Sequence, residues 1–397
     1  MALVQKQFGD LITFTRSSAG GRFNERGLFE MVPANQPRFD YDPFTRELKG
    51  LLIEEPRTNF VLNSNDVTLF ARNAGASTQV STEMSPDGVT PATEVQMPGG
   101  NTGSGVYRAN NQTSLPGTYS IFVKPLTGNG VLRLTMEGSA YQGMGAGSVL
   151  FDLMRETFSP AGPAGEVRGG IKKLSGGWFR IHMSRSVSAG TGATNITFYA
   201  GDLEAKSFAV TWPQLENGIF PTSYIPTQAS QVTRTADLPL INTLRPWYNN
   251  PESAIYTEFA PGEIGIGGTS VAFWFRSREN AANSLITTRR DGSQGGITSI
   301  MSDQSGVVRA RLTVAAKTSP GDIVKSAFSL KLNYFSISVN GSEVVRDNPQ
   351  NVTPMAQPDY LALGSTGNGQ QFLNGHLRAI RYYPRILMDS ELKEMTK

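Results

Sequence analysis

The fold class is decided by one stretch of the sequence, FSISVNGSEVV at residues 335–345. Apolar and polar residues alternate strictly from Phe335 to Val339, which is the period of a strand with one buried face. The alternation then meets Asn340-Gly341, a dipeptide preferred in type I′ hairpin turns because both central residues need a positive φ. The stretch therefore predicts two antiparallel strands joined by a tight turn.

The same period of two recurs along most of the chain. It is found at residues 119–124, 132–136, 179–184, 208–212, 255–259, 271–275 and 309–314. Several short, half-buried strands at close spacing favour a sandwich or jelly roll. Only the C-terminus favours a helix, because Asp389 is suited to cap it and Lys393 and Lys397 suit its other end. A helix this short must dock on the neighbouring sheet to persist.

The composition agrees with an all-β protein of more than one domain. The chain has 397 residues, with 42 Gly, 23 Pro and only 17% charged residues, a balance typical of many strands joined by tight turns. We predict two β-sandwich domains, jelly-roll or concanavalin A-like, behind an extended N-terminal β module. The predicted boundaries are 1–60 for the module, used in attachment or oligomerisation, 61–230 for the first sandwich, 231–250 for a connector and 251–397 for the second sandwich.

Several classes of protein are disfavoured by the sequence. The net charge of +3 is small for this length and lacks the clustered Lys and Arg of nucleic-acid-binding proteins. The absence of cysteine excludes disulfides and thiolate metal sites. The sequence contains no run of about 18 apolar residues, so we expect no membrane span. The first residues, MALVQKQF, lack the apolar core of a signal peptide.

Three stretches near the N-terminus carry a resemblance to a known family. They are ITFTRSS (12–18), PRFDYDP (37–43) and GLLIEEPRTN (50–59). Together they resemble the opening module of many bacteriophage tail-fibre and virion structural proteins.

A second set of residues resembles the carbohydrate-binding-like sandwich that follows this module in the same family. WPQLENG (212–218) and PTSYIPT (221–227) are similar to its closing segment, and GWFR (177–180) matches an internal strand motif. The family usually has Trp-Gly-Ala-Gln-Leu-Glu where this chain has Trp212-Pro213-Gln214-Leu215-Glu216. Because this version is one residue shorter and contains proline, we expect the local strand end to differ.

The C-terminal part is similar to concanavalin A-like (laminin-G-like) sandwiches. The similarity rests on WYNN (247–250), SVNG (338–341), GHLR (375–378) and YPR (383–385). These resemblances imply a virion subunit, assembled in the host cytoplasm, that contacts other virion proteins. By analogy with phage fibres we expect a homo-oligomer, with a trimer favoured. The resemblances do not identify a ligand, because fold-level similarity does not fix function.

The sequence shows no compact catalytic pattern, and we predict that the protein is not an enzyme. Glu54 and Glu55 are adjacent, so on a strand they point to opposite faces and cannot flank one glycosidic bond together. The alternating acidic residues of concanavalin A-like glycosidases are not evident in 251–397. A carboxylate pair assembled from distant strands is the alternative.

The sequence also favours no cofactor. The two histidines, His182 and His376, fit surface positions on strands better than a Ser-His-Asp site or a zinc site. The glycine-rich residues 143–147 open no helix, so we expect a flexible loop and not a phosphate site. A calcium ion held by loop carboxylates such as Asp291 or Asp303 is the alternative to an absence of metal.

Three aromatic residues are candidates for sugar recognition, which needs an aromatic face beside polar side chains. Trp247 and Tyr248 lie in the connector, and Trp274 lies on the strand face opposite Phe273 and Phe275. Packing is the competing interpretation, with Trp247-Tyr248 at the domain interface and Trp274 on the second face of the sandwich.

The leading hypothesis is a virion structural protein, a tail-fibre or appendage subunit that binds host-surface glycan. One alternative is a head or collar decoration subunit, or a scaffold subunit, that makes only protein–protein contacts. A glycan depolymerase is the second alternative.

Overall fold

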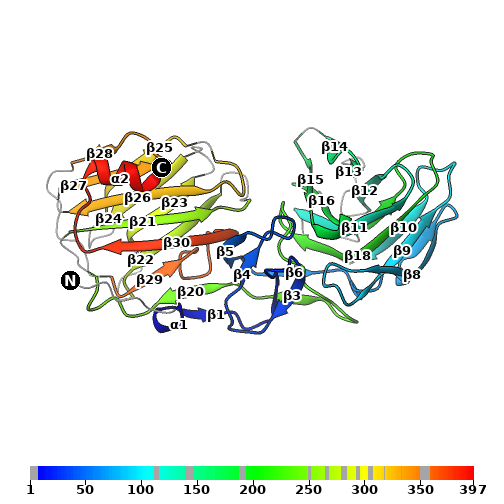
Figure 1. Cartoon of the computed structure of the whole chain (residues 1–397), viewed down its shortest axis with the longest axis horizontal. Helices are drawn as coiled ribbons and strands as arrows, with labels where there is room; N and C mark the ends of the chain where they lie inside the picture. Colours follow the sequence, from blue (N-terminus) through cyan, green and yellow to red (C-terminus); the bar gives the residue numbers. More distant parts are fainter. Residues whose placement is uncertain are drawn as a thin grey trace.

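The protein is all-β, as predicted, and consists of two β-sandwich lobes with the N-terminal segment between them (Figure 1). The computed structural model describes residues 8–110, 116–138, 147–163, 165–186, 194–248, 252–263, 268–278, 284–291, 296–302, 307–316, 318–331, 333–348 and 358–397. In this part of the chain the helices are α1 (Phe8–Leu11) and α2 (Asp389–Thr396). Neither has the length or the hydrophobicity to span a bilayer.

The middle lobe is built from two six-stranded antiparallel sheets. One sheet has the order β14 (Thr157–Ala161), β13 (Gly147–Asp152), β12 (Val131–Glu137), β17 (Thr194–Tyr199), β10 (Gly105–Asn110) and β7 (Ala71–Asn73). The other has the order β15 (Val167–Lys173), β16 (Phe179–Arg185), β11 (Gly117–Thr127), β18 (Lys206–Asn217), β9 (Pro91–Met97) and β8 (Ser77–Met84).

The C-terminal lobe is built from two seven-stranded sheets. One has the order β1 (Thr13–Thr15), β20 (Leu238–Ile241), β29 (Tyr360–Leu363), β22 (Thr269–Arg276), β23 (Ser284–Asp291), β24 (Gly296–Ser302) and β25 (Val308–Val314). The other has the order β28 (Val345–Asp347), β27 (Tyr334–Val339), β26 (Val324–Lys331), β21 (Glu252–Ala260), β30 (Gly375–Tyr383), β5 (Leu48–Ile53) and β4 (Phe39–Tyr41).

Segments from both sides of the middle lobe complete the C-terminal sheets. From the N-terminal segment, β1 pairs with β20 of the connector, and β5 pairs with β30. Two short ribbons, β2 (Gly20–Phe23) with β3 (Phe29–Val32) and β6 (Arg57–Asn59) with β19 (Val232–Arg234), lie at the junction of the lobes. The stretches 1–60 and 231–250 therefore share sheets with the C-terminal lobe.

Strand β11 of the middle lobe differs from the half-buried pattern expected of it. Tyr119 and Ile121 face the main core of the lobe, as the alternation predicts. The opposite face is buried as well, because Phe122 joins a second apolar cluster that includes Phe29 of the N-terminal segment and Trp212. The N-terminal segment thus covers a sheet face that the alternation alone assigns to solvent.

The expected irregularity at Trp212-Pro213 is a β-bulge inside β18 and not a change at a strand end. The register of β18 against β11 shifts at this point, and Trp212 has a φ of 56°. A bulky residue rarely adopts this left-handed conformation. Here the Trp212 ring is stacked on Tyr224, with ring centroids 5.1 Å apart and planes inclined by 9°, and it also packs against Phe29. These contacts offset the local strain.

The turn predicted at residues 340–341 is confirmed. Asn340 and Gly341 both have positive φ, 47° and 73°, as a type I′ turn requires. The C-terminal helix is also confirmed, but Asp389 does not cap it. The N-cap is Met388, whose backbone N–H donates to the Glu391 carboxylate at 2.7 Å, while Asp389 accepts a hydrogen bond from the Tyr334 hydroxyl.

The helix α2 is held by packing on the C-terminal lobe. Leu392 is fully buried in an apolar cluster with Leu387, Tyr256 and Ala327. We predict that Leu392→Ala lowers the free energy of unfolding by about 2–5 kcal/mol, because it removes buried methyl groups and leaves a cavity. Chemical denaturation of the full chain measures this. Met388→Ala, at an exposed position, is the control and is expected to change the free energy by less than about 0.5 kcal/mol. Equal effects of the two substitutions would contradict the packing role.

Candidate functional site

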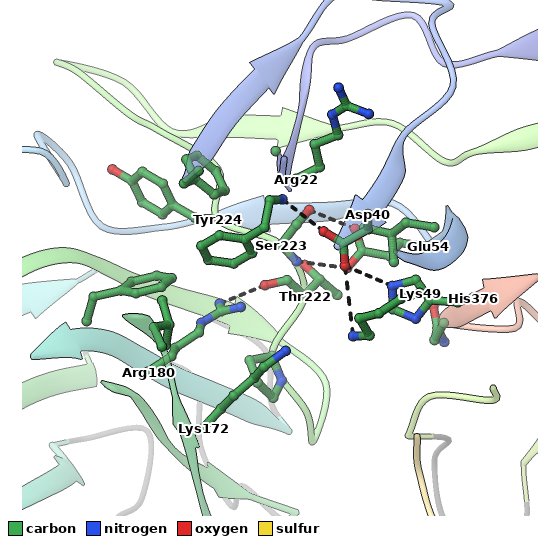
Figure 2. A pocket seen from close by; sticks show the side chains of 18 residues that line it. Arg22, Asp40, Lys49, Glu54, Lys172, Arg180, Thr222, Ser223, Tyr224 and His376 are labelled. Atoms are coloured by element: carbon green, nitrogen blue, oxygen red, sulfur yellow. Dashed lines mark hydrogen bonds and ion pairs between the residues drawn. The ribbon is translucent and has the colours of Figure 1, made fainter. Parts of the chain in front are cut away.

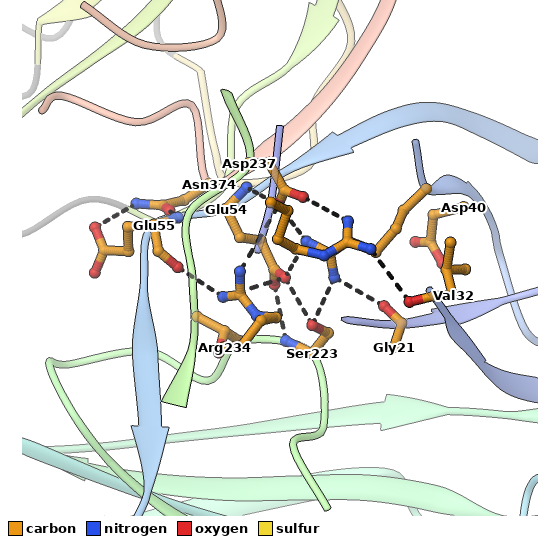
Figure 3. A network of polar contacts seen from close by, with 12 residues as sticks. Gly21, Val32, Asp40, Glu54, Glu55, Ser223, Arg234, Asp237 and Asn374 are labelled. Atoms are coloured by element: carbon orange, nitrogen blue, oxygen red, sulfur yellow. Dashed lines mark hydrogen bonds and ion pairs between the residues drawn. The ribbon is translucent and has the colours of Figure 1, made fainter. Parts of the chain in front are cut away.

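A network of buried charged side chains joins the two lobes (Figure 3). Arg38, which is fully buried, bonds to both carboxylates of the network, Asp237 and Glu54, the latter at 2.8 Å. Asp237 also accepts from the backbone N–H of Glu54 at 2.9 Å. Burial lowers the pKa of Arg38, but these two carboxylates outweigh burial and the pKa is raised. The network therefore keeps its central guanidinium charged.

Two further arginines complete the network. Arg16 contacts Asp237 at 2.9 Å, and Arg234 lies 3.4 Å from Glu54 and 3.7 Å from Asp237. The spare donors of Arg16 bond to backbone carbonyl groups, among them Pro33 at 2.8 Å. Burial raises the pKa of Glu54, but Arg234, Arg38 and the hydrogen bonds from Ser223 outweigh it, so the pKa is held far below its ordinary value.

The middle lobe is attached to this network through the segment after β18. Ser223 donates to the Glu54 carboxylate from its backbone N–H, at 2.8 Å, and from its hydroxyl, at 2.7 Å. The preceding Thr222 bonds in the same way to Glu216 at 3.0 and 2.7 Å. Gln214 holds this segment too, since its side-chain oxygen accepts from the backbone N–H of Ile225 at 2.7 Å.

These contacts bring together the stretches that carry the resemblance to phage proteins. Arg16, Arg38 and Glu54 come from the three N-terminal stretches, and Gln214 and Ser223 come from the two stretches of the sandwich's closing segment. The sequence alone did not show that these five stretches meet in one network of ion pairs and hydrogen bonds. It also missed Arg234 and Asp237, for which the available signal was a charged Arg-x-x-Asp in an otherwise polar connector.

A cavity of about 190 Å³ lies beside the network, between the lobes (Figure 2). It is lined by residues of the N-terminal segment, of the middle lobe and of β30, and it is rich in charge. The cationic lining residues are Arg22, Lys49, Lys172 and Arg180, and the acidic ones are Asp40 and Glu54.

A buried His–Asp pair forms one wall of this cavity. His376 Nε2 lies 2.9 Å from the carboxylate of Asp40, which also accepts from the backbone N–H of Phe23 at 2.8 Å. Burial and the nearby Lys49 lower the pKa of His376, and Asp40 only partly opposes them. The surface position expected for His376 is therefore wrong, because it is 8% exposed and turned inward onto Asp40.

The other predicted histidine, His182, is half-buried on β16 and does not reach this cavity. Its ring packs over Gly170 of β15, where any added Cβ would clash with it. Burial, reinforced by Arg180, lowers the pKa of His182 to about 3. The ring is therefore neutral at neutral pH and serves packing.

A second cavity, of about 370 Å³, lies on another side of the junction. Arg57 stacks on Phe220, with the guanidinium 4.7 Å from the ring centroid, and contacts Glu55 at 2.5 Å. Asn374 donates to the Glu55 carboxylate at 3.0 Å. Gln371 is exposed along the same lining. The cavity thus combines apolar ring surface with amide, carboxylate and guanidinium groups.

The opposite orientations predicted for Glu54 and Glu55 are confirmed. Glu54 lines the first cavity and Glu55 lines the second. The two carboxylates therefore serve different sites and cannot act as one acid–base pair.

The predicted sugar-binding aromatics line neither cavity. Trp247 packs against Tyr382, with centroids 5.1 Å apart, and its ring N–H donates to the carbonyl of Thr243 at 3.2 Å. Tyr248 packs on Phe275 and Tyr382, within the C-terminal lobe and not between the lobes. Trp274 lies on β22 with the Arg276 guanidinium 5.3 Å from its ring. The structure brings Trp247 and Tyr248 together, and their role in binding stays a prediction.

The remaining predicted sites fall largely outside the described residues. Asp303 and residues 143–146 are not described, and for Asp291 only the backbone is. Within the described ranges, no group of three or more His, Asp or Glu side chains is arranged to hold a metal ion.

Comparisons with known proteins give no family. No protein-family model and no curated protein matches the sequence. Similar solved structures include the CBM40 of the Ruminococcus gnavus IT-sialidase, at 14% identity over 38% of this chain and 84% of that one, with a TM-score of 0.32. The receptor-binding domain of botulinum neurotoxin C/D mosaic serotype is 10% identical over 41% of this chain and 40% of that one, with a TM-score of 0.32. Leech intramolecular trans-sialidase is 16% identical over 37% and 23%, with a TM-score of 0.31. Likeness at this level carries no argument about function.

The ion network predicts a large and specific loss of stability when one carboxylate is removed. Asp237→Asn is expected to lower the free energy of unfolding by about 3–5 kcal/mol, because the buried Arg16 and Arg38 each lose a carboxylate partner. Chemical denaturation followed by tryptophan fluorescence measures this.

The control for this substitution is Glu343→Gln, in an exposed ion pair with Lys393, which is expected to leave the unfolding midpoint nearly unchanged. The double variant Arg16→Met with Asp237→Asn should lose less than the sum of the two single losses. Additive losses, or equal effects of Asp237→Asn and Glu343→Gln, would show that the network does not act as a unit.

Proposed function

We propose that this chain is a bacteriophage virion structural protein, a tail-fibre or related appendage subunit that binds host-surface glycan and is not an enzyme. The observation that carries the proposal is the convergence of the five family-like stretches on one buried ion network. A virion appendage has to present its binding domains in a set orientation. Here the segments that resemble the phage family are the ones that hold the two lobes against each other.

The second cavity is the site we propose for glycan. A sugar is recognised by an apolar ring face together with donors and acceptors for its hydroxyl groups. The lining supplies Phe220 and Phe372 for the first requirement, and Glu55, Gln371 and Asn374 for the second. Its volume of about 370 Å³ suits a group of the size of one or two sugar rings.

Binding without catalysis is supported by the state of the carboxylates. A glycosidase needs one carboxyl group that is protonated near neutral pH, as the general acid. Glu54 has the opposite property, since its pKa lies far below the ordinary value and Arg38 and Arg234 neutralise its charge. Glu55 is held by Arg57 and Asn374. Both carboxylates are thus engaged in structural contacts.

Oligomerisation is the remaining part of the proposal, and phage fibres suggest a trimer. Individual sugar contacts are weak, and linking several copies raises the overall affinity without any new contact. A homo-oligomer of a rigid two-lobed subunit would present several such cavities in parallel.

Glycan binding is tested with single variants of the second cavity. Gln371→Ala and Glu55→Gln are expected to weaken binding to a microarray of bacterial cell-surface glycans about tenfold, because the first removes a hydrogen-bonding amide and the second replaces a charged acceptor with a neutral amide. Gln370→Ala, at the neighbouring exposed position, is the matched control and should bind as the unchanged protein does. If no glycan is retained, or if the cavity variants bind as tightly as the control, glycan recognition at this site is refuted.

Location in the particle is tested by immunogold labelling of assembled virions with an antibody against the full chain. Gold on the tail appendage is the expected result. Gold confined to the head or collar would favour the decoration alternative, and unlabelled particles would refute the virion role.

A further inference from the structure

Two ammonium groups from different lobes meet in the first cavity. Lys49 lies on β5 of the C-terminal lobe, and Lys172 lies on β15 of the middle lobe. Both side chains line this cavity, close enough for the charge of Lys172 to act on Lys49. An ammonium group only donates, so the two charges repel. Burial and this repulsion lower the pKa of Lys49 to about 8, although Asp40 and Asp42 oppose them.

The nearby carboxylates compensate these charges only in part. Asp40 lies 3.9 Å from Lys49 but is already bonded to His376 and to the backbone of Phe23. Asp42 lies 3.4 Å from Lys172 and also accepts from two backbone N–H groups of its own turn, at Phe44 and Thr45. Each carboxylate is therefore shared between an ammonium group and other donors.

Among the other charged groups of the lining, Arg22 is paired with Glu30 at 2.6 Å, so it is Arg180 that adds to the cationic charge. Glu54 is neutralised by Arg38 and Arg234, which do not line the cavity. Arg180 reaches the carbonyl of Thr222 at 2.7 Å through one nitrogen. Its Nε is buried and has no hydrogen-bond partner among the described residues. The lining thus includes Lys49, Lys172 and Arg180 as cations.

We propose that the first cavity binds a tetrahedral oxyanion, a sulfate or phosphate group, held between Lys49 and Lys172. A doubly charged anion at this position would offset both ammonium charges and turn the repulsion between the lobes into a bridge. The volume of about 190 Å³ accommodates such a group together with several waters, each of which takes about 30 Å³. This site is distinct from the glycan cavity, so the proposal does not depend on glycan binding there.

The test is a titration of the full chain with sodium sulfate and with sodium phosphate at pH 7 and constant ionic strength. Binding is measured by isothermal calorimetry and by the rise in melting temperature. Saturable binding in the millimolar range or tighter is expected. Lys49→Gln and Lys172→Gln should each raise the half-saturating concentration about tenfold or more, because each removes a charge-assisted hydrogen bond. Lys172→Arg should retain binding, since it keeps the charge.

The control is Lys331→Gln, which removes a lysine on β26 that lies over Tyr334 and lines neither cavity. It separates specific binding from the general stabilisation that sulfate gives to folded proteins. A second arm compares a 6-sulfated monosaccharide with its unsulfated parent. Tighter binding of the sulfated sugar than of inorganic sulfate would identify a glycan-borne group, and the reverse would identify a free ion. Binding that is not saturable, or that both lysine variants leave unchanged, overturns the proposal.

Discussion

The arrangement of this molecule depends on five buried charged side chains, Arg16, Arg38, Glu54, Arg234 and Asp237. Charges removed from water are costly unless each one finds its partners. Here each of the two carboxylates contacts two or three guanidinium groups, and Ser223 donates to Glu54 as well. The groups come from the N-terminal segment, the connector and the loop after β18. The network is therefore complete only when all three segments are in place, which makes the orientation of the lobes specific as well as stable.

Much of the fold could be predicted from the sequence, because strands and turns leave local patterns. The strand at 335–339 and the turn at Asn340-Gly341 are each predicted from a few adjacent residues, and the structure confirms both. The opposite orientations of Glu54 and Glu55 follow from the same period of two. Burial predicted from local periodicity is wrong where a segment far away in the sequence packs against the strand. The second face of β11 is covered by a cluster that includes Phe29 of the N-terminal segment, and His376 is turned inward onto the distant Asp40.

The junction could not be predicted for the same physical reason. An ion network between residues far apart in the chain has no periodicity, so Arg234 and Asp237 look like ordinary polar connector residues. Aromatic residues were the more visible signal for a binding site, yet Trp247 and Tyr248 pack on Tyr382 within one lobe. Both cavities lie instead where the lobes meet, and residues of both lobes line each of them. Their shape therefore depends on the relative position of the two lobes, and not on either lobe alone.

The pairing of β5 with β30 also bears on how the polypeptide acquires its shape during synthesis. During synthesis β1 and β5 precede the middle lobe, but their partner strands β20 and β30 emerge only after it. The middle lobe contains all of its own strands and is free to form as soon as it has been translated. Until then the early strands present unpaired edges, which are prone to aggregate. Such long-range closure slows folding, and the segment that follows the middle lobe completes the sheets that the segment before it began.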